Sequence, residues 1–161
     1  MSFKNGELET DYMNLTIDET QVAHDNEPNE DGLIIWYTLE NTSDENIVPS
    51  GEWYNFVIKQ QDESTEYDLT EYLDMFDSAE ALYPTVDESG ELVDDATWDK
   101  SIDDQEQFYS EYEEPAENEL LPGKTKQFVT SVTLNNVEKP VTIQIDDMLP
   151  VSENEEYKIN L

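Results

Sequence analysis

The sequence contains one histidine, His24, which lies beside Asp25 in a polar stretch. A serine–histidine–aspartate site would need this histidine as its base, but no G-x-S-x-G nucleophile motif is present. A zinc site at His24 would have to recruit carboxylates alone, which zinc seldom accepts. Cysteine is absent, and the five glycines form no phosphate-binding loop. We therefore expect His24 to be a solvent-exposed loop residue, and we expect no enzymatic activity.

Two groups of aspartates are candidates for calcium binding, because hard cations prefer clustered oxygen ligands on a turn. Asp25 and Asp31 bound an acidic stretch, in which Pro28 and the ligand spacing break the EF-hand pattern. The second group comprises Asp94, Asp95, Asp99, Asp103 and Asp104. Runs of like charge usually form a solvated face. We favour that interpretation, so the sequence predicts no cofactor and leaves calcium as the alternative.

The charge of the chain excludes several classes of partner. Forty-one acidic residues stand against seven lysines and no arginine, which gives a formal net charge of −34. Proteins bind nucleic acids and anionic membranes through cations, so neither is an expected ligand. A glycosidase needs two carboxylates in one shaped cleft. With forty-one acidic residues in the chain, the sequence does not single out any such pair.

Alternation of apolar and polar residues predicts six strands. They cover residues 13–18, 33–40, 53–60, 128–134, 141–145 and 157–161. Between the first two we expect an acidic loop over 25–31 that ends in a turn at Asp31-Gly32. The predicted core face comprises Leu33, Ile35, Tyr37 and Leu39, beside Phe128 and Val132. Trp53 and Tyr54 are expected to pack in the core or at an edge, although they could form a glycan or peptide platform.

The middle of the chain follows a different pattern. Apolar residues at helical spacing predict a helix within 69–83, ended by Pro84. Residues 87–119 carry fourteen acidic side chains against one lysine. Helical spacing recurs there, but aspartates four residues apart would repel one another. We therefore confine the helix prediction to 69–83 and treat 65–119 as an elaborated, partly helical acidic crossover. Residues 1–11 are expected to be a flexible lead-in to one domain over 12–161.

Three segments together resemble a known family. Residues 33–45 resemble a strand that enters an N-x-S-D/E turn. Residues 56–62 resemble a strand that enters a Q-D-G corner, and residues 121–125 resemble a PG-x-T turn. The set is similar to immunoglobulin-like domains of unknown function in Gram-positive cell-surface lipoproteins, over about 12–64 and 120–146. Glu63 in place of glycine, the long 65–119 segment and the heavier acidity depart from that pattern.

The resemblance implies a mainly β, immunoglobulin-like antiparallel β-sandwich outside the cytoplasm. It implies anchoring at the cell surface in the full-length form, by a signal and an anchor that are absent from this chain. The family supplies no catalytic residues. A weaker resemblance links residues 50–56 to bacterial intracellular proteinase-inhibitor domains, with Asn55 where those have an acid.

The expected function is that of a non-enzymatic binding or scaffolding domain. Its partner would be an unknown protein or a cell-wall component. Two alternatives act on a protein partner instead. One is an acidic mimic of nucleic acid that occupies a DNA-binding protein, and the other is an inhibitor of proteinases.

Overall fold

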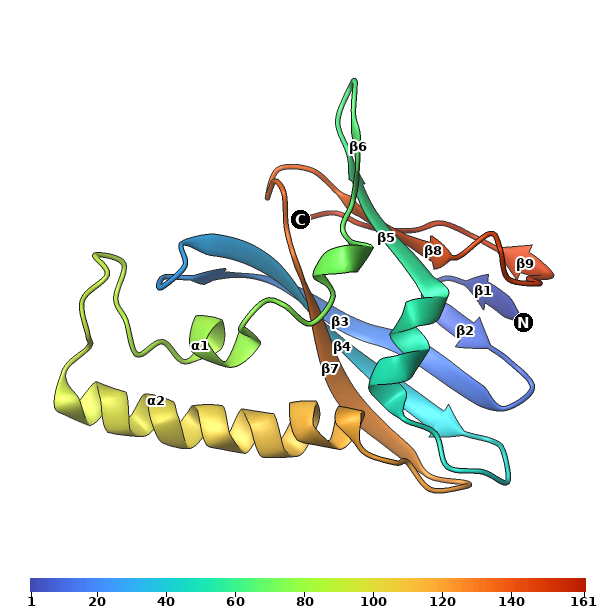
Figure 1. Cartoon of the computed structure of the whole chain (residues 1–161), viewed down its shortest axis with the longest axis horizontal. Helices are drawn as coiled ribbons and strands as arrows, with labels where there is room; N and C mark the ends of the chain where they lie inside the picture. The colour runs from blue at the N-terminus through green and yellow to red at the C-terminus, as the bar shows by residue number, and fades with distance from the viewer.

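The computed structural model describes residues 1–161 and contains two β-sheets with a helical layer on one of them (Figure 1). The larger sheet has six strands, in the order β7 (Thr125–Thr133), β4 (Glu30–Asn41), β3 (Met13–Asp25), β2 (Glu7–Glu9), β1 (Ser2–Lys4) and β9 (Glu153–Asn154). The smaller sheet has four, in the order β10 (Tyr157–Ile159), β8 (Val141–Ile145), β5 (Phe56–Gln61) and β6 (Glu66–Asp68). All neighbouring strands are antiparallel except β1 and β9. The predicted mainly β, two-sheet sandwich is confirmed.

The main core lies between the two sheets and contains 23 buried residues. The predicted core face of β4 is confirmed, because its four alternate side chains are at most 1% exposed. They pack with Phe128 and Val132 of β7, which are equally buried. Trp53 and Phe56 add a stack of aromatic rings with centroids 4.9 Å apart.

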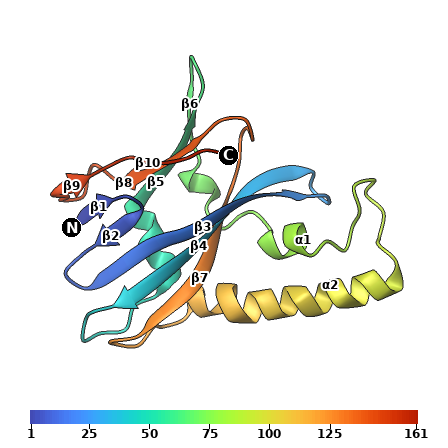
Figure 2. The ribbon, with the colours of Figure 1, turned by 180° about the vertical axis from the view of Figure 1, so that it is seen from behind.

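The outer face of the six-stranded sheet is also covered, which makes β4 a strand buried on both sides. Ile34 of β4 and Val129 of β7 pack there against Phe76 and Phe108. Phe108 ends helix α2 (Asp95–Phe108), which runs lengthwise beneath this face (Figure 1). The short helix α1 (Ser78–Leu82) lies between α2 and the β3–β4 hairpin, as the reverse view also shows (Figure 2). The molecule therefore has three layers: the small sheet, the large sheet and the helices.

The expected flexible lead-in over residues 1–11 is wrong. This segment forms the β1–β2 hairpin, and its side chains Phe3 and Leu8 are fully buried. The Phe3 ring packs edge-on against Phe56 at 5.3 Å between centroids. Each strand has only three residues with one apolar side chain, which is too short for an alternating pattern to appear in the sequence.

The expected loop over 25–31, with its turn at Asp31-Gly32, is also corrected. Strands β3 and β4 extend to a tight turn at residues 26–29, where Asn29 adopts a positive φ of 56°. Gly32 lies within β4, beneath the Phe76 ring. A Cβ atom at this position would lie 2.3 Å from a ring carbon, so the close approach of Phe76 requires glycine.

The strand predicted over 53–60 begins later than expected. Residues Pro49–Asn55 form the 3₁₀-helix η1, and β5 starts at Phe56. Proline is favourable at the start of such a helix, because its φ is already fixed there. Trp53 is buried as predicted, whereas Tyr54 points outward and is 77% exposed.

Most of the helical structure lies outside the predicted 69–83. That range contains only the 3₁₀-turn η2 (Thr70–Tyr72) and α1, separated by an extended segment that follows the edge of β7. The longest helix is α2, which continues as the π-helical turn η3 (Tyr109–Glu113) and the 3₁₀-turn η4 (Glu114–Glu117). Repulsion of a few tenths of a kcal/mol per aspartate pair is smaller than the gain from burying Phe108. The helices are all too short or too polar to cross a membrane.

Candidate functional site

The first predicted calcium group is not assembled. Asp25 ends β3, is 3% exposed, and accepts a hydrogen bond from the Glu27 backbone N–H at 3.1 Å. Asp31 lies opposite His24 in the β3–β4 register, with Oδ1 2.7 Å from Nδ1 of the imidazole. Asp31 raises the pKa of His24 by this hydrogen bond. The histidine is exposed as expected, although it belongs to a strand and not to a loop.

The second calcium group is spread along α2. Asp94 is the N-cap residue, and its carboxylate accepts the Thr97 backbone N–H at 2.9 Å. Asp95, Asp99 and Asp103 are exposed on the helix surface. No group of three or more histidine, cysteine or acidic residues in the chain is arranged to hold a metal ion. These three aspartates form an exposed acidic face of α2.

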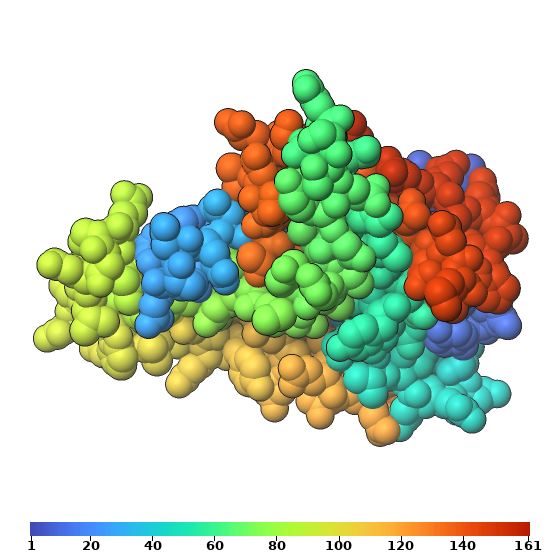
Figure 3. Space-filling view, turned by 45° about the horizontal axis from the view of Figure 1, so that its top comes forward, coloured from blue at the N-terminus to red at the C-terminus, as the bar shows by residue number.

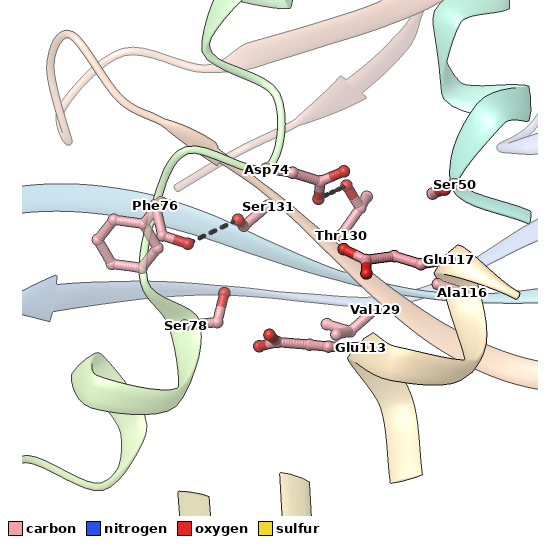
Figure 4. Close-up of a pocket in the computed structure, with 10 residues that line it drawn as sticks. All are labelled: Ser50, Asp74, Phe76, Ser78, Glu113, Ala116, Glu117, Val129, Thr130 and Ser131. Carbon is pink, nitrogen blue, oxygen red and sulfur yellow. Dashed lines mark hydrogen bonds between the residues drawn. The ribbon is translucent and has the colours of Figure 1, made fainter. Parts of the chain in front are cut away.

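The candidate site is a cavity of about 90 Å³ between the helical layer and β7 (Figure 4). Its lining combines carboxylates, hydroxyls and a few apolar side chains, and contains no lysine or histidine. The carboxylates are Asp74, from the segment before α1, Glu113 of η3 and Glu117 of η4. Strand β7 lines the bottom of the cavity with Val129, Thr130 and Ser131. The site exists only because three segments distant in sequence meet on the outer face of the sheet.

Asp74 is fixed in the wall of this cavity. Its Oδ1 atom accepts a hydrogen bond of 2.6 Å from the Thr130 hydroxyl, and its backbone N–H donates to the Ser131 carbonyl at 2.8 Å. The backbone of Asp74 has a positive φ of 58°, an uncommon conformation that aspartate tolerates. Burial raises the pKa of the Asp74 carboxyl. One oxygen of the Asp74 carboxylate is thus anchored to β7, although the residue as a whole is exposed to solvent.

Glu113 extends from η3 into the cavity toward α1 (Figure 4). Its carboxylate accepts no hydrogen bond from the protein. Burial, followed by the charges of Asp77, Asp74 and Glu117, raises its pKa to about 7. The local arrangement therefore disfavours the negative charge of Glu113 in the absence of a cation.

Ser78 completes the cavity from the first turn of α1. The residue is 3% exposed, its side chain faces the cavity, and its hydroxyl has no hydrogen-bond partner in the protein (Figure 4). The neighbouring Ser131 hydroxyl differs, because it donates to the Phe76 carbonyl at 3.1 Å. Ser78 is therefore a buried polar group that is free to bind a ligand.

Sequence analysis missed every residue of this cavity. Asp74 and Glu113 are 2 of 41 acidic residues, and nothing local distinguishes them. One signal was present, since Phe108 and Tyr112 are four residues apart, as are Glu113 and Glu117, which is the spacing of one helical turn. Extending the acidic helix to residue 117 would have placed both carboxylates at its C-terminal end. Their meeting with Ser78 and β7 depends on tertiary packing alone.

The chemistry of the lining is that of a binding site for positively charged donor groups. Carboxylates and an unpartnered hydroxyl provide hydrogen-bond acceptors. The lining contains no thiol, amine or imidazole, and its hydroxyls belong to serine and threonine side chains.

The comparisons with known proteins agree with the architecture. The model of a family described as a domain of unknown function, DUF5067, matches residues 1–147. A "putative lipoprotein" from Staphylococcus aureus is similar in structure, with a TM-score of 0.65 and 14% identity over 97% of this chain and 90% of that one. A protein from Enterococcus faecalis is similar with a TM-score of 0.58 and 15% sequence identity, over 99% of this chain and 92% of that one. An uncharacterized β-sandwich protein from Clostridium difficile is similar with a TM-score of 0.51 and 14% sequence identity, over 97% of this chain and 91% of that one.

These TM-scores over nearly the whole of each chain show a shared fold. The comparison with curated proteins found no match. Because the family model covers nearly the whole sequence, the chain belongs to the DUF5067 family. The family predicted from the strand and turn motifs, a domain of unknown function with lipoprotein relatives in Gram-positive bacteria, is confirmed.

Proposed function

We propose that this DUF5067 domain is a non-enzymatic binding or scaffolding module, exposed on the surface of a Gram-positive cell as part of a lipoprotein. The observation that carries the proposal is the cavity on β7, whose lining offers carboxylate and hydroxyl acceptors and no positively charged side chain. The shared fold with a protein described as a lipoprotein supports the location.

The partner is a protein or a cell-wall component that presents positive charge. A net charge of −34 attracts cations over the whole surface and speeds their encounter with the domain. The same charge repels nucleic acids and anionic membranes. The alternatives, a mimic of nucleic acid and a proteinase inhibitor, would place the domain inside the cell.

Protease accessibility on intact cells tests the location and, with it, these alternatives. The full-length protein is produced in its native host, and a membrane-impermeant protease is added before and after lysis. We expect digestion of the domain on intact cells, while a cytosolic marker is cleaved only after lysis. Protection of the domain until lysis would overturn the surface assignment.

Sedimentation with purified cell walls tests the binding role. The domain should co-sediment at low salt and be released by added NaCl, as charge attraction requires. Enzymatic release of soluble wall fragments by the pure domain would contradict a non-enzymatic role.

A further inference from the structure

We infer that the cavity between α1, η3 and β7 binds a primary ammonium group, presented by a lysine side chain of a protein partner. The inference deepens the proposed binding function and rests on it. It specifies the chemical group that the cavity recognises and the residues that contact it.

Three acceptors converge on the cavity from three elements. The Ser78 hydroxyl of α1 is buried and lacks a partner. The Glu113 carboxylate of η3 accepts no hydrogen bond from the protein. Asp74 uses one carboxylate oxygen for the Thr130 hydroxyl, which leaves the other available. An ammonium group has three N–H donors and no acceptor, which suits a cavity lined by acceptors.

The charge of the site also requires a cation. Asp74 and Asp77 face Glu113 from the segment around the start of α1, and Glu117 faces it from η4. No lysine or histidine lies in the lining. Like charges gathered in a partly desolvated site destabilise one another, and the raised pKa of Glu113 agrees with this. A bound ammonium would replace the repulsion by attraction.

The size of the cavity restricts the ligand to one functional group. A volume of about 90 Å³ exceeds the space that one water needs, but it is far below that of pockets for drug-sized molecules. Phe76, Ala116 and Val129 form an apolar part of the wall that can contact methylene groups. A compact charge on a flexible apolar stem describes lysine, whereas the planar guanidinium of arginine needs a bidentate partner.

The overall charge of the domain selects the kind of molecule that carries this lysine. A surface with −34 net charge attracts basic proteins over long range. The space-filling view shows an elongated molecule with the helical layer along its lower edge (Figure 3). We therefore assign the ammonium to a basic protein that lies along the acidic helical layer and inserts one lysine.

An NMR titration of the ¹⁵N-labelled domain with Nα-acetyl-lysine N-methylamide at pH 8 tests the assignment. We expect saturable shifts of the Asp74, Ser78 and Thr130 amides. The norleucine analogue, which has a matched stem without the ammonium group, should produce none. Glu113→Gln and Ser78→Ala should each weaken binding at least several-fold, and affinity should fall from pH 8 to pH 6 as Glu113 is protonated.

Glu106→Gln is the matched control, because it removes one exposed carboxylate from α2, the helix that continues into η3. Retained binding by this variant, with loss in Glu113→Gln, supports the site. An equal loss in both would mean diffuse attraction and overturn the site, while the cell-surface experiment would still decide the proposed function. Tighter binding of the arginine analogue, or displacement of the lysine analogue by micromolar CaCl₂, would overturn the ammonium assignment. If Ser78→Ala fails to fold, Glu113→Gln alone decides the outcome.

Discussion

The Glu113 carboxyl has a pKa near 7 in the folded protein, against an ordinary value of 4.5. The folded state therefore holds this proton more tightly than the unfolded state does. The group destabilises the fold fully above about pH 7, and the penalty disappears as pH falls toward 4.5. Glu113→Gln should then raise the free energy of unfolding at pH 8 by about 1–2 kcal/mol, a figure reduced for solvent screening.

Urea unfolding at pH 8 and pH 5 measures this effect. The gain from Glu113→Gln should shrink strongly at pH 5, where the wild-type carboxyl is already neutral. Glu106→Gln should change the free energy of unfolding by no more than about 0.5 kcal/mol at either pH. An equal gain at both pH values would show that the amide acts through packing and not through charge.

The buried hydroxyl of Tyr37 also affects the stability of the fold. Its hydroxyl and the indole N–H of Trp53 are buried without hydrogen-bond partners, and the two rings meet edge to face at 5.2 Å. An unmade buried hydrogen bond costs about 1–3 kcal/mol. Tyr37→Phe should therefore leave the free energy of unfolding unchanged or raise it by up to about 1 kcal/mol.

The control for Tyr37→Phe is Tyr12→Phe. The Tyr12 hydroxyl donates to Glu52 Oε2 at 2.9 Å, so its removal should lower the free energy of unfolding by about 1 kcal/mol. Denaturant melts of both variants give the comparison. A larger loss in Tyr37→Phe than in Tyr12→Phe would indicate a buried partner for the Tyr37 hydroxyl.

At the scale of elements, the start of α2 depends on one side chain. Asp94 accepts hydrogen bonds from both the backbone N–H and the hydroxyl of Thr97. Asp94→Ala should cost about 1 kcal/mol and increase hydrogen exchange in the first turn of α2. Asp94→Asn should retain most of the stability, because asparagine also caps helices. Asp99→Ala should leave exchange at that turn unchanged, and faster exchange there would argue against the cap.

The elements differ in how far their sequence reveals them. The core face of β4 was predictable from alternation at Leu33 to Leu39, because one side of a long strand faces the core between the sheets. Strand β1 contributes a single buried side chain, Phe3, which no periodicity can signal. Helix α2 buries few side chains over a length of 14 residues, so its apolar stripe is thin against its many charges.

The cavity was not predictable for a related reason. Its groups lie on η1, on the irregular segment before α1, on the first turn of α1, on two irregular helical turns and on β7. The positive φ of Asp74 and the π-helical turn that carries Glu113 are set by packing against the sheet. A single sequence contains the residues but not the tertiary contacts that bring them together.

At the scale of the whole molecule, the net charge of −34 should govern stability. Raising NaCl from about 0.01 M to about 0.1 M shortens the screening length from about 30 Å to about 10 Å. We expect the melting temperature to rise by about 2–8 °C if screening recovers about 1–2 kcal/mol. A melting temperature independent of NaCl would contradict the repulsion argument.

Calcium provides the matching test of the aspartate groups. At equal ionic strength, CaCl₂ should raise the melting temperature no more than NaCl does, because we expect no specific calcium site. Specific binding of calcium to the folded state would add a saturable gain. A saturable excess that is lost in Asp25→Asn or Asp99→Asn would show that one group does bind calcium.

The parallel pairing of β1 with β9 also determines the order in which the chain can fold. Ser2 lies opposite Glu153, and the Met1 carbonyl accepts hydrogen bonds from the backbone and hydroxyl of Ser152. The β1–β2 hairpin is local and can form early, but its outer edge has no partner until the last segment of the chain arrives. Pairing β1 with β9 closes a loop of about 150 residues. This step is slow, because the chain loses conformational entropy before the stabilising contacts form. A nascent chain would therefore keep one edge of its larger sheet open, and accessible to other strands, until residues 153–154 had been synthesised.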